Sequence, residues 1–298
     1  MTERGTPLAT RLLLASRPLS WVNTAYPFAA AMLLAGHGVD AAFVIGTVFF
    51  LVPYNLLMYG VNDVFDYASD AANPRKGGVE GALLPPRTHR LALGLAFGIA
   101  LPFVVALALL GSPLSWLVLA VLLFDVVAYS APPMRWKEVP GLDSLSSSLH
   151  FVGPAVYGLV LAGAEWTTTS WLVLGAFLLW GMASHAFGAV QDIVPDREAG
   201  IASIATVLGA RVTVRLALAG WTLAGVLLLL TPFPWLLAAA FAVPYLALAW
   251  PYRSLPDAAS ARANRGWRRF LWVNYAVGFG VTLLLIAQLM DGGALTTA

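Results

Sequence analysis

Long apolar runs separated by short polar segments make up most of the chain. An α-helix needs about 20 apolar residues to cross the roughly 30 Å hydrocarbon core of a bilayer. Runs of about that length predict nine membrane spans: residues 18–36, 41–61, 90–110, 114–131, 146–163, 169–190, 212–230, 234–250 and 270–290. Several gaps are short Gly/Pro turns, which are typical between antiparallel neighbours. The pattern predicts an all-α integral membrane protein that forms a single domain over residues 1–298.

The composition agrees with a chain that lies in lipid. Of the 298 residues, 59% are hydrophobic and 11% are charged, and the mean hydropathy is +0.78. Soluble domains carry about 25% charged residues, so this chain has too few to cover a water-facing surface. The sequence has no cysteine, which excludes disulfides and thiolate metal sites. The first apolar run lacks a small-residue cleavage site, so we take it as a retained helix and not a signal peptide.

The basic residues gather on one side of the predicted membrane. With the loops numbered alternately, one side receives the N-terminus and four segments, 62–89, 132–145, 191–211 and 251–269. That side holds all 17 Lys and Arg when residues at helix ends, such as Arg90 and Arg215, are counted with their nearest loop. The charged residues of the opposite side are Asp40, Glu165 and Asp291. The positive-inside rule therefore predicts a multi-pass protein of the cell membrane with a cytoplasmic N-terminus and an extracytoplasmic C-terminus. The sequence pI of about 9.0 is explained by basic residues in the short loops of a protein that lies in the lipid bilayer. We therefore expect no nucleic-acid partner.

Four polar residues close the second predicted span: Asn62, Asp63, Asp66 and Asp70. If the helix continues, Asn62, Asp66 and Asp70 share one face, with Asp63 beside them. Carboxylates crowded on one helix face repel each other, and a divalent cation would remove that cost.

A second acidic cluster, Asp192 and Asp196, follows the sixth span, where Pro195 should kink or end the helix. Mg²⁺ prefers oxygen ligands and is usually held by one or two carboxylates together with substrate phosphates. Two clusters of this kind predict a Mg²⁺ site that binds a diphosphate. The bound metal would neutralise the negative charge that develops on the diphosphate as it leaves. The alternative is that they are ordinary acids at the water interface.

Basic side chains near these clusters are the expected partners of phosphate. This set comprises Arg75, Lys76, Arg135, Lys137 and Arg197. For six other arginines we prefer a topological role with contact to anionic lipid: Arg87, Arg90, Arg262, Arg265, Arg268 and Arg269.

A few polar residues lie inside the predicted spans and are candidates to line an internal chamber. They are Asn23, Asn55, Asp125 and His185. Asp125 is expected either to pair with a basic group or to accept a proton at the end of a reaction. Asn55 has an alternative role in hydrogen bonds between helices, and His185 an alternative as a packed, hydrogen-bonded residue.

These motifs resemble the UbiA family of intramembrane prenyltransferases. The first family motif, N-D-x-x-D-x-x-x-D, is matched at residues 62–70, and the second, D-x-x-x-D-R-x-x-G, at residues 192–200 with Ser203 and Gly209 after it. Residues 129–137 resemble the loop after the fourth helix, which adds Tyr129 to the expected diphosphate contacts. The resemblance implies a nine-helix bundle around a central apolar chamber that is capped on the cytoplasmic side. It also implies that Mg²⁺ bridges the acids to an isoprenyl diphosphate, with Asp66 and Asp196 essential for catalysis.

A narrower resemblance is to the actinobacterial lycopene elongases of C50 carotenoid biosynthesis, over residues 17–28, 62–83 and 189–211. It implies that a five-carbon unit from dimethylallyl diphosphate is added to each end of lycopene. One alternative is prenylation of an aromatic acceptor, such as a quinone precursor or a porphyrin. An alternative from another class is a transporter or channel, in which the acids form a cation vestibule. Related systems also suggest a membrane partner subunit.

Overall fold

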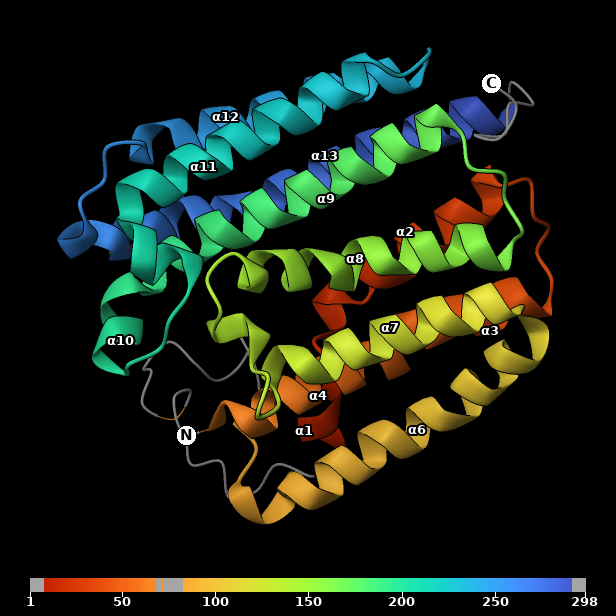
Figure 1. Cartoon of the computed structure of the whole chain (residues 1–298), viewed down its shortest axis with the longest axis horizontal. Coiled ribbons are helices and arrows are strands. Elements are labelled where there is room, and N and C mark those ends of the chain that lie inside the picture. Colours follow the sequence, from red (N-terminus) through yellow and green to blue (C-terminus); the bar gives the residue numbers. More distant parts are fainter. Residues whose placement is uncertain (1–7, 68–70, 72–82, 291–298) are drawn as a thin grey trace. The chain divides into compact units, whose positions relative to one another are not determined.

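The computed structural model describes residues 8–67, 71 and 83–290, and every regular element within those residues is a helix (Figure 1). The chain divides into two compact units, each built from separate stretches of sequence. The first unit contains residues 1–32, 38–135 and 153–162, and the second contains residues 33–37, 136–152 and 163–298. Each unit is described by itself below.

The first unit holds the N-terminal helices. They are α1 (Leu8–Ala15), η2 (Pro18–Ser20), most of α2 (Val22–Leu34), α3 (Ala41–Leu51), α4 (Pro53–Phe65), η4 (Pro86–Thr88), α6 (His89–Leu110), α7 (Pro113–Ser130) and the second half of α8 (Leu142–Leu161). Helix α4 packs against α1, α6 and α7. The core of this unit contains a cluster of fully buried aromatic rings. The ring centroid of Phe50 lies 5.1 Å from those of Phe28 and Tyr54. Burial of this aromatic surface stabilises the unit.

The second predicted span consists of two helices in sequence, α3 and α4. The break falls at Val52, whose φ of −120° and ψ of −59° lie outside the helical region. Pro53 explains the break, because its ring lacks an N–H and clashes with the carbonyl four residues earlier. The first position of α4 tolerates proline, since that N–H has no partner within the helix. The chain therefore still runs as one apolar segment from Ala41 to Phe65.

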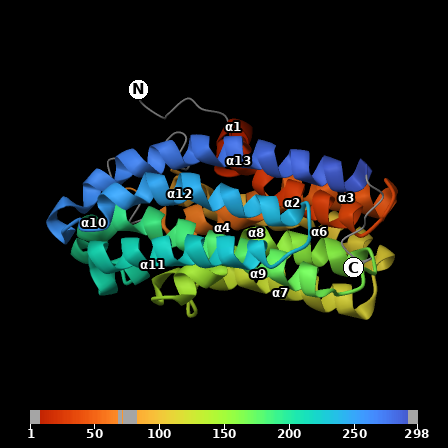
Figure 2. The same cartoon turned by 90° about the horizontal axis from the view of Figure 1, so that it is seen from above.

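The second unit holds the remaining helices. They are η5 (Trp136–Glu138), the first half of α8, α9 (Thr168–Ala189), η6 (Val190–Asp192), α10 (Ile193–Glu198), α11 (Ile204–Leu229), η7 (Trp235–Phe241), α12 (Ala242–Ala249), η8 (Trp250–Tyr252), η9 (Asp257–Ala263) and α13 (Asn264–Met290). Helix α11 packs along α9 and α12, and α12 lies beside α13, as Figures 1 and 2 show. Trp221 stacks on Tyr245 with ring centroids 5.5 Å apart in the centre of this unit.

Eight helical segments in the described residues are long and apolar enough to cross a membrane, and they correspond to the second to ninth predicted spans. The first predicted span contains α2, which has 13 residues and a length of about 20 Å, so the count of nine remains a prediction. Large apolar side chains such as Leu109 and Met290, each 82% exposed, project from these helices. The protein is a multi-pass membrane protein, and such surfaces are suited to lipid.

Candidate functional site

The first acidic cluster lies at the C-terminal end of α4. The helix ends at Phe65, and the N–H of Asp66 donates to the carbonyl of Asn62 at 2.9 Å. Asn62 and Asp66 are therefore one helical turn apart, as the sequence predicts. Asp70, together with Arg75 and Lys76, lies outside the described residues, so their places remain predictions.

Two arginines bring positive charge to this cluster. Arg17 Nη2 donates to Asp63 Oδ1 at 2.9 Å, and Arg135 Nη2 lies 3.8 Å from Asp66 Oδ1. Among the described residues, Arg17 and Arg135 are the only non-glycine residues with positive φ, at 51° and 41°. Such conformations cost about 1–3 kcal/mol and persist where surrounding contacts hold them, often at functional sites. The backbone strain of the first unit is thus located at the two residues that face its aspartates.

Helix α7 contributes to the same cluster through its last residue. Ser130 Oγ donates to Asn62 Oδ1 at 2.9 Å, which joins the C-terminal ends of α7 and α4. Tyr129 is partly buried one position earlier. The first unit therefore places the Tyr129–Arg135 segment beside the first acidic cluster. Lys137 lies in η5, which belongs to the second unit.

The second acidic cluster occupies a break in the helical path after α9. Asp192 ends the 3-10 turn η6, and Asp196 lies in the short helix α10, and both are partly buried. Pro195 is the third residue of α10, where its missing N–H is tolerated. In a continuous α-helix the ring of Pro195 would clash with the carbonyl of Gln191, four residues earlier. This clash accounts for the change from the α-helix α9 to the 3-10 turn η6. The sequence predicts that Pro195 kinks or ends the helix, and in the structure α9 gives way to the 3-10 turn η6 before Pro195.

A buried acid that the sequence analysis did not single out anchors the start of α11. Asp143 is fully buried, and its Oδ1 accepts hydrogen bonds from the N–H groups of Gly141 and Ser144 at 2.8 and 2.7 Å. Its Oδ2 accepts from the N–H of Ile204, the first residue of α11, at 2.8 Å. Asp143 therefore satisfies N–H groups that helix starts leave without a partner.

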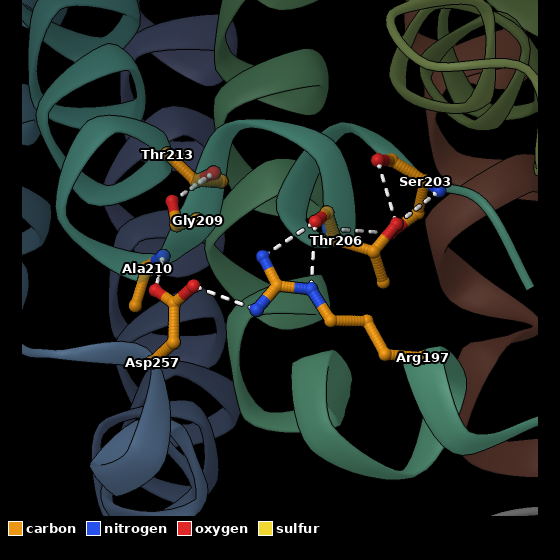
Figure 3. Close-up of polar contacts among 7 residues, drawn as sticks. All are labelled: Arg197, Ser203, Thr206, Gly209, Ala210, Thr213 and Asp257. Carbon is orange, nitrogen blue, oxygen red and sulfur yellow. Dashed lines mark hydrogen bonds and ion pairs between the residues drawn. The ribbon is translucent and has the colours of Figure 1, made fainter.

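Arg197, expected to contact diphosphate, binds protein groups in this structure. Its Nε and Nη2 donate to the carbonyl of Thr206 at 2.9 and 2.6 Å, and its Nη1 lies 2.7 Å from Asp257 Oδ2 (Figure 3). Arg197 thus connects α10 with the first turn of α11 and with η9.

Two of the four interior candidates, Asn55 and His185, form hydrogen bonds with neighbouring residues. Asn55 is fully buried, and its Nδ2 donates to Thr24 Oγ1 at 2.7 Å and to the carbonyl of Phe50 at 2.8 Å, which matches its alternative role between helices. His185 is within 3.1 Å of Ser144 Oγ, as expected of a packed, hydrogen-bonded residue.

The other two interior candidates differ in burial. Asp125 is 2% exposed on α7. Asn23 lies on an exposed part of α2. Of these two candidates, Asp125 is the buried one, and its role in a chamber stays a prediction.

Three residues that form these contacts were missed in the sequence analysis: Arg17, Asp143 and Asp257. The only local sign for Arg17 is a positive charge before the first span, which topology already explains. Asp143 and Asp257 lie in short polar segments with no repeated spacing. All three residues have partners far away in the chain: Arg17 contacts Asp63, 46 positions away, Asp257 accepts from Ala210, 47 positions away, and Asp143 accepts from Ile204, 61 positions away. A single sequence does not reveal such contacts.

The donor atoms of the two clusters fit Mg²⁺. Both clusters offer oxygen ligands, which Mg²⁺ prefers over nitrogen and sulfur. Within the described part of the chain, no three His, Asp or Glu side chains converge to hold a metal ion by themselves. Mg²⁺ is typically held by one or two carboxylates together with substrate phosphates.

Comparisons with known proteins agree on one family. The model of the UbiA prenyltransferase family matches residues 24–275. The chain is 50% identical to a lycopene elongase/hydratase of Corynebacterium glutamicum, over 93% of this chain and 96% of that protein. It is 54% identical to the C(50) beta-cyclic carotenoids biosynthesis protein LbtBC of Dietzia sp. (strain CQ4), over 95% of this chain but only 66% of the Dietzia protein. The fold is similar to that of a UbiA homolog from Archaeoglobus fulgidus solved with DMAPP and Mg²⁺, with a TM-score of 0.65 and 17% identity over 90% of this chain and 98% of that one.

Proposed function

Because the chain belongs to the UbiA prenyltransferase family, we propose that it transfers five-carbon units from dimethylallyl diphosphate to the two ends of lycopene. The observation that carries this proposal is the 50% identity to a lycopene elongase/hydratase across 96% of that protein. The use of Mg²⁺ and an allylic diphosphate is supported by the related fold solved with DMAPP and Mg²⁺.

The acidic clusters are the proposed metal ligands: Asn62, Asp63, Asp66, Asp70, Asp192 and Asp196. When bound, Mg²⁺ supplies Lewis-acid stabilisation of the charge that develops on the leaving diphosphate. Phosphate oxygens are contacted by Arg75, Lys76, Tyr129, Arg135 and Lys137. The position of Arg135, with its Nη2 3.8 Å from Asp66 Oδ1, supports this assignment, because it places a guanidinium beside the first acidic cluster.

The acceptor half of the reaction needs little ionisable chemistry. Loss of diphosphate leaves an allylic cation, and the terminal double bond of lycopene attacks it to form a new C–C bond and a tertiary cation. Apolar helices around the acceptor exclude water from the first cation. The tertiary cation is quenched by loss of a proton, for which we assign Asp125 as the acceptor, or by capture of water.

The orientation and domain organisation belong to the same proposal. A cytoplasmic N-terminus places both acidic clusters on the side where soluble allylic diphosphates are made. A single domain is supported by the family match, which runs through both compact units. Reporter fusions at the two termini test the orientation, and activity of a cytoplasmic reporter at the C-terminus would contradict it. The membrane partner subunit stays a prediction.

Expression in a lycopene-accumulating host tests the acceptor. We expect new C45 and C50 pigments by mass spectrometry, and none with an Asp66→Ala variant present in the membrane at the same level. Unchanged lycopene together with a newly prenylated quinone precursor or porphyrin would overturn the lycopene assignment in favour of the aromatic acceptor. Unchanged lycopene with no prenylated product of any kind would contradict prenyl transfer itself.

A further inference from the structure

One short segment is tied to both ends of the second acidic cluster. The segment comprises η9 and the first residue of α13, residues 257–264, and we refer to it as the bracket. Asn264 Nδ2 donates to Gln191 Oε1, next to Asp192, and Asp257 pairs with Arg197, next to Asp196. The bracket therefore holds the neighbours of both aspartates within the second unit.

The contact at Asp257 lies at an interruption of α11. Gly209 has a φ of 77° and a ψ of 165°, so the helical path breaks there. In a continuous helix the N–H of Ala210 would donate to the carbonyl of Thr206. Here the Ala210 N–H donates to Asp257 Oδ1 at 2.7 Å, while the Thr206 carbonyl accepts from Arg197 (Figure 3). The Arg197–Asp257 pair thus takes the place of one backbone hydrogen bond.

Gly209 is required at this interruption for two reasons. Its positive φ is costly for any residue with a Cβ. A Cβ at this position would also lie 2.9 Å from Asp257 Oδ1, closer than van der Waals contact allows. The glycine therefore makes the space that Asp257 occupies against the helix.

The energetics of the Arg197–Asp257 pair favour a geometric role. The two side chains are 44% and 39% exposed, and exposed ion pairs contribute little to overall stability. The backbone groups of Thr206 and Ala210 are fixed by these side chains, however, and α10 packs on both α11 and η9. Loss of the pair should disturb the local position of α10 more than the stability of the whole protein.

At its other end the bracket is buried. Gln191 is 8% exposed, and its Nε2 donates to the carbonyl of Gly188 at 3.0 Å while its Oε1 accepts from Asn264. Ser260 and Ala263, between the two contacts, are almost fully buried. The bracket is therefore a packed support with one exposed and one buried connection to the acidic cluster.

We propose that Asp257 and Asn264 are positioning residues that hold Asp192 and Asp196 in the arrangement that binds Mg²⁺ and diphosphate. This inference rests on the proposed function. Each residue acts through the neighbour of an aspartate, Asp257 through Arg197 and Asn264 through Gln191. Direct hydrogen-bond partners of metal ligands typically change metal affinity or activity by about 10–100-fold, and for these residues, which lie one position further out, we expect the lower end of that range.

The first test is the Mg²⁺ dependence of prenyl transfer by the purified full-length protein. Asp257→Asn keeps an oxygen for the Ala210 N–H but removes the charge that faces Arg197. We expect the half-saturating Mg²⁺ concentration to rise by about 10-fold, with kcat at saturating Mg²⁺ close to that of the wild type. Asn264→Ala should behave in the same way. Arg262→Gln, which changes an exposed charge within η9, is the matched control and should leave the Mg²⁺ dependence unchanged.

The inference is overturned if Asp257→Asn and Asn264→Ala both keep the wild-type Mg²⁺ dependence. It is also overturned if kcat falls with no change in that dependence, because a general structural defect would do this. An inactive wild-type protein would instead count against the proposed function, so the two failures are distinguishable.

A second measurement needs no activity. The chain has no cysteine, so Ala199→Cys gives a unique site for a spin label directly after α10. Asp257→Asn should increase the mobility of this label. A label at Leu230→Cys, at the opposite end of α11, should be unaffected. Equal mobility at position 199 with and without Asp257→Asn would contradict the positioning role.

Discussion

Arg17 and Asp63, 46 positions apart in the sequence, form an ion pair with 2.9 Å between Nη2 and Oδ1. The Asp63 side chain is 1% exposed and that of Arg17 is 20% exposed, so Arg17 supplies a positive charge next to a buried carboxylate. The Arg17 guanidinium also lies 4.2 Å from the centre of the Tyr59 ring. The segment before α2 is thereby fixed to the first acidic cluster.

Replacement of Arg17 by Gln should destabilise the protein by about 2 kcal/mol, because a nearly buried carboxylate loses its counter-charge. The free energy of unfolding in mild detergent measures this effect. In the double variant with Asp63→Asn we expect most of the stability to return, since the unpaired charge is gone, while prenyl transfer stays low. Arg87→Gln, at an exposed arginine of the same unit, is the control. Additive losses in the double variant would show that the pair is not coupled.

Much of the fold follows from periodicity and length alone. The apolar runs predict the second to ninth spans, because lipid demands long apolar helices whatever their packing partners. Local exceptions have local causes, such as the break before Pro53. The short α2 was not foreseen, because hydropathy reports an apolar run and not where its helix begins and ends.

The site was less accessible to the sequence. Its acidic motifs are visible because their spacing places Asn62 and Asp66 one turn apart. The partners of those acids are not visible, since Arg17, Asp143 and Asp257 act over long sequence separations. Arg197 shows the same limit: its position in the motif suggests phosphate, and only the structure reveals its bonds to Thr206 and Asp257.

Mg²⁺ and pyrophosphate should stabilise the protein cooperatively. Mg²⁺ is usually held by one or two carboxylates together with substrate phosphates, so we expect Mg²⁺ alone to bind weakly. Both together, at about 100 times their joint dissociation constant, should add about 2.7 kcal/mol. Thermal unfolding with each ligand separately and then together measures this, and EDTA should abolish the joint effect. Full stabilisation by Mg²⁺ alone would contradict a site that the diphosphate completes.

Asn55→Leu should lower stability without changing the product. The variant removes hydrogen bonds to Thr24 and to the carbonyl of Phe50, and leaves buried polar atoms without a partner, at a cost of about 1–3 kcal/mol. The free energy of unfolding and the KM for lycopene are the two readouts. A raised KM at unchanged stability would instead return Asn55 to the wall of the acceptor chamber.

Asp125→Asn should slow turnover while diphosphate binding is retained. Asn is close in size to Asp but is a far weaker proton acceptor, and a general base typically contributes about 10²–10⁴-fold to a rate. We therefore expect kcat to fall by about 100-fold or more. The matched control is Asp40→Asn, at the cap of α3, where the replacement can still accept from the N–H of Phe43. An unchanged kcat for Asp125→Asn would remove this residue from the reaction.

The central claim is that carboxylates of both acidic clusters bind one magnesium–diphosphate group. Equilibrium binding of a non-reactive dimethylallyl diphosphate analogue in the presence of Mg²⁺ tests it most directly, with the wild-type protein, Asp66→Ala and Asp196→Ala compared at equal folded concentration. We predict a single site per chain in the wild type and loss of binding in each variant alone. Wild-type affinity in either variant would contradict joint binding by the two clusters.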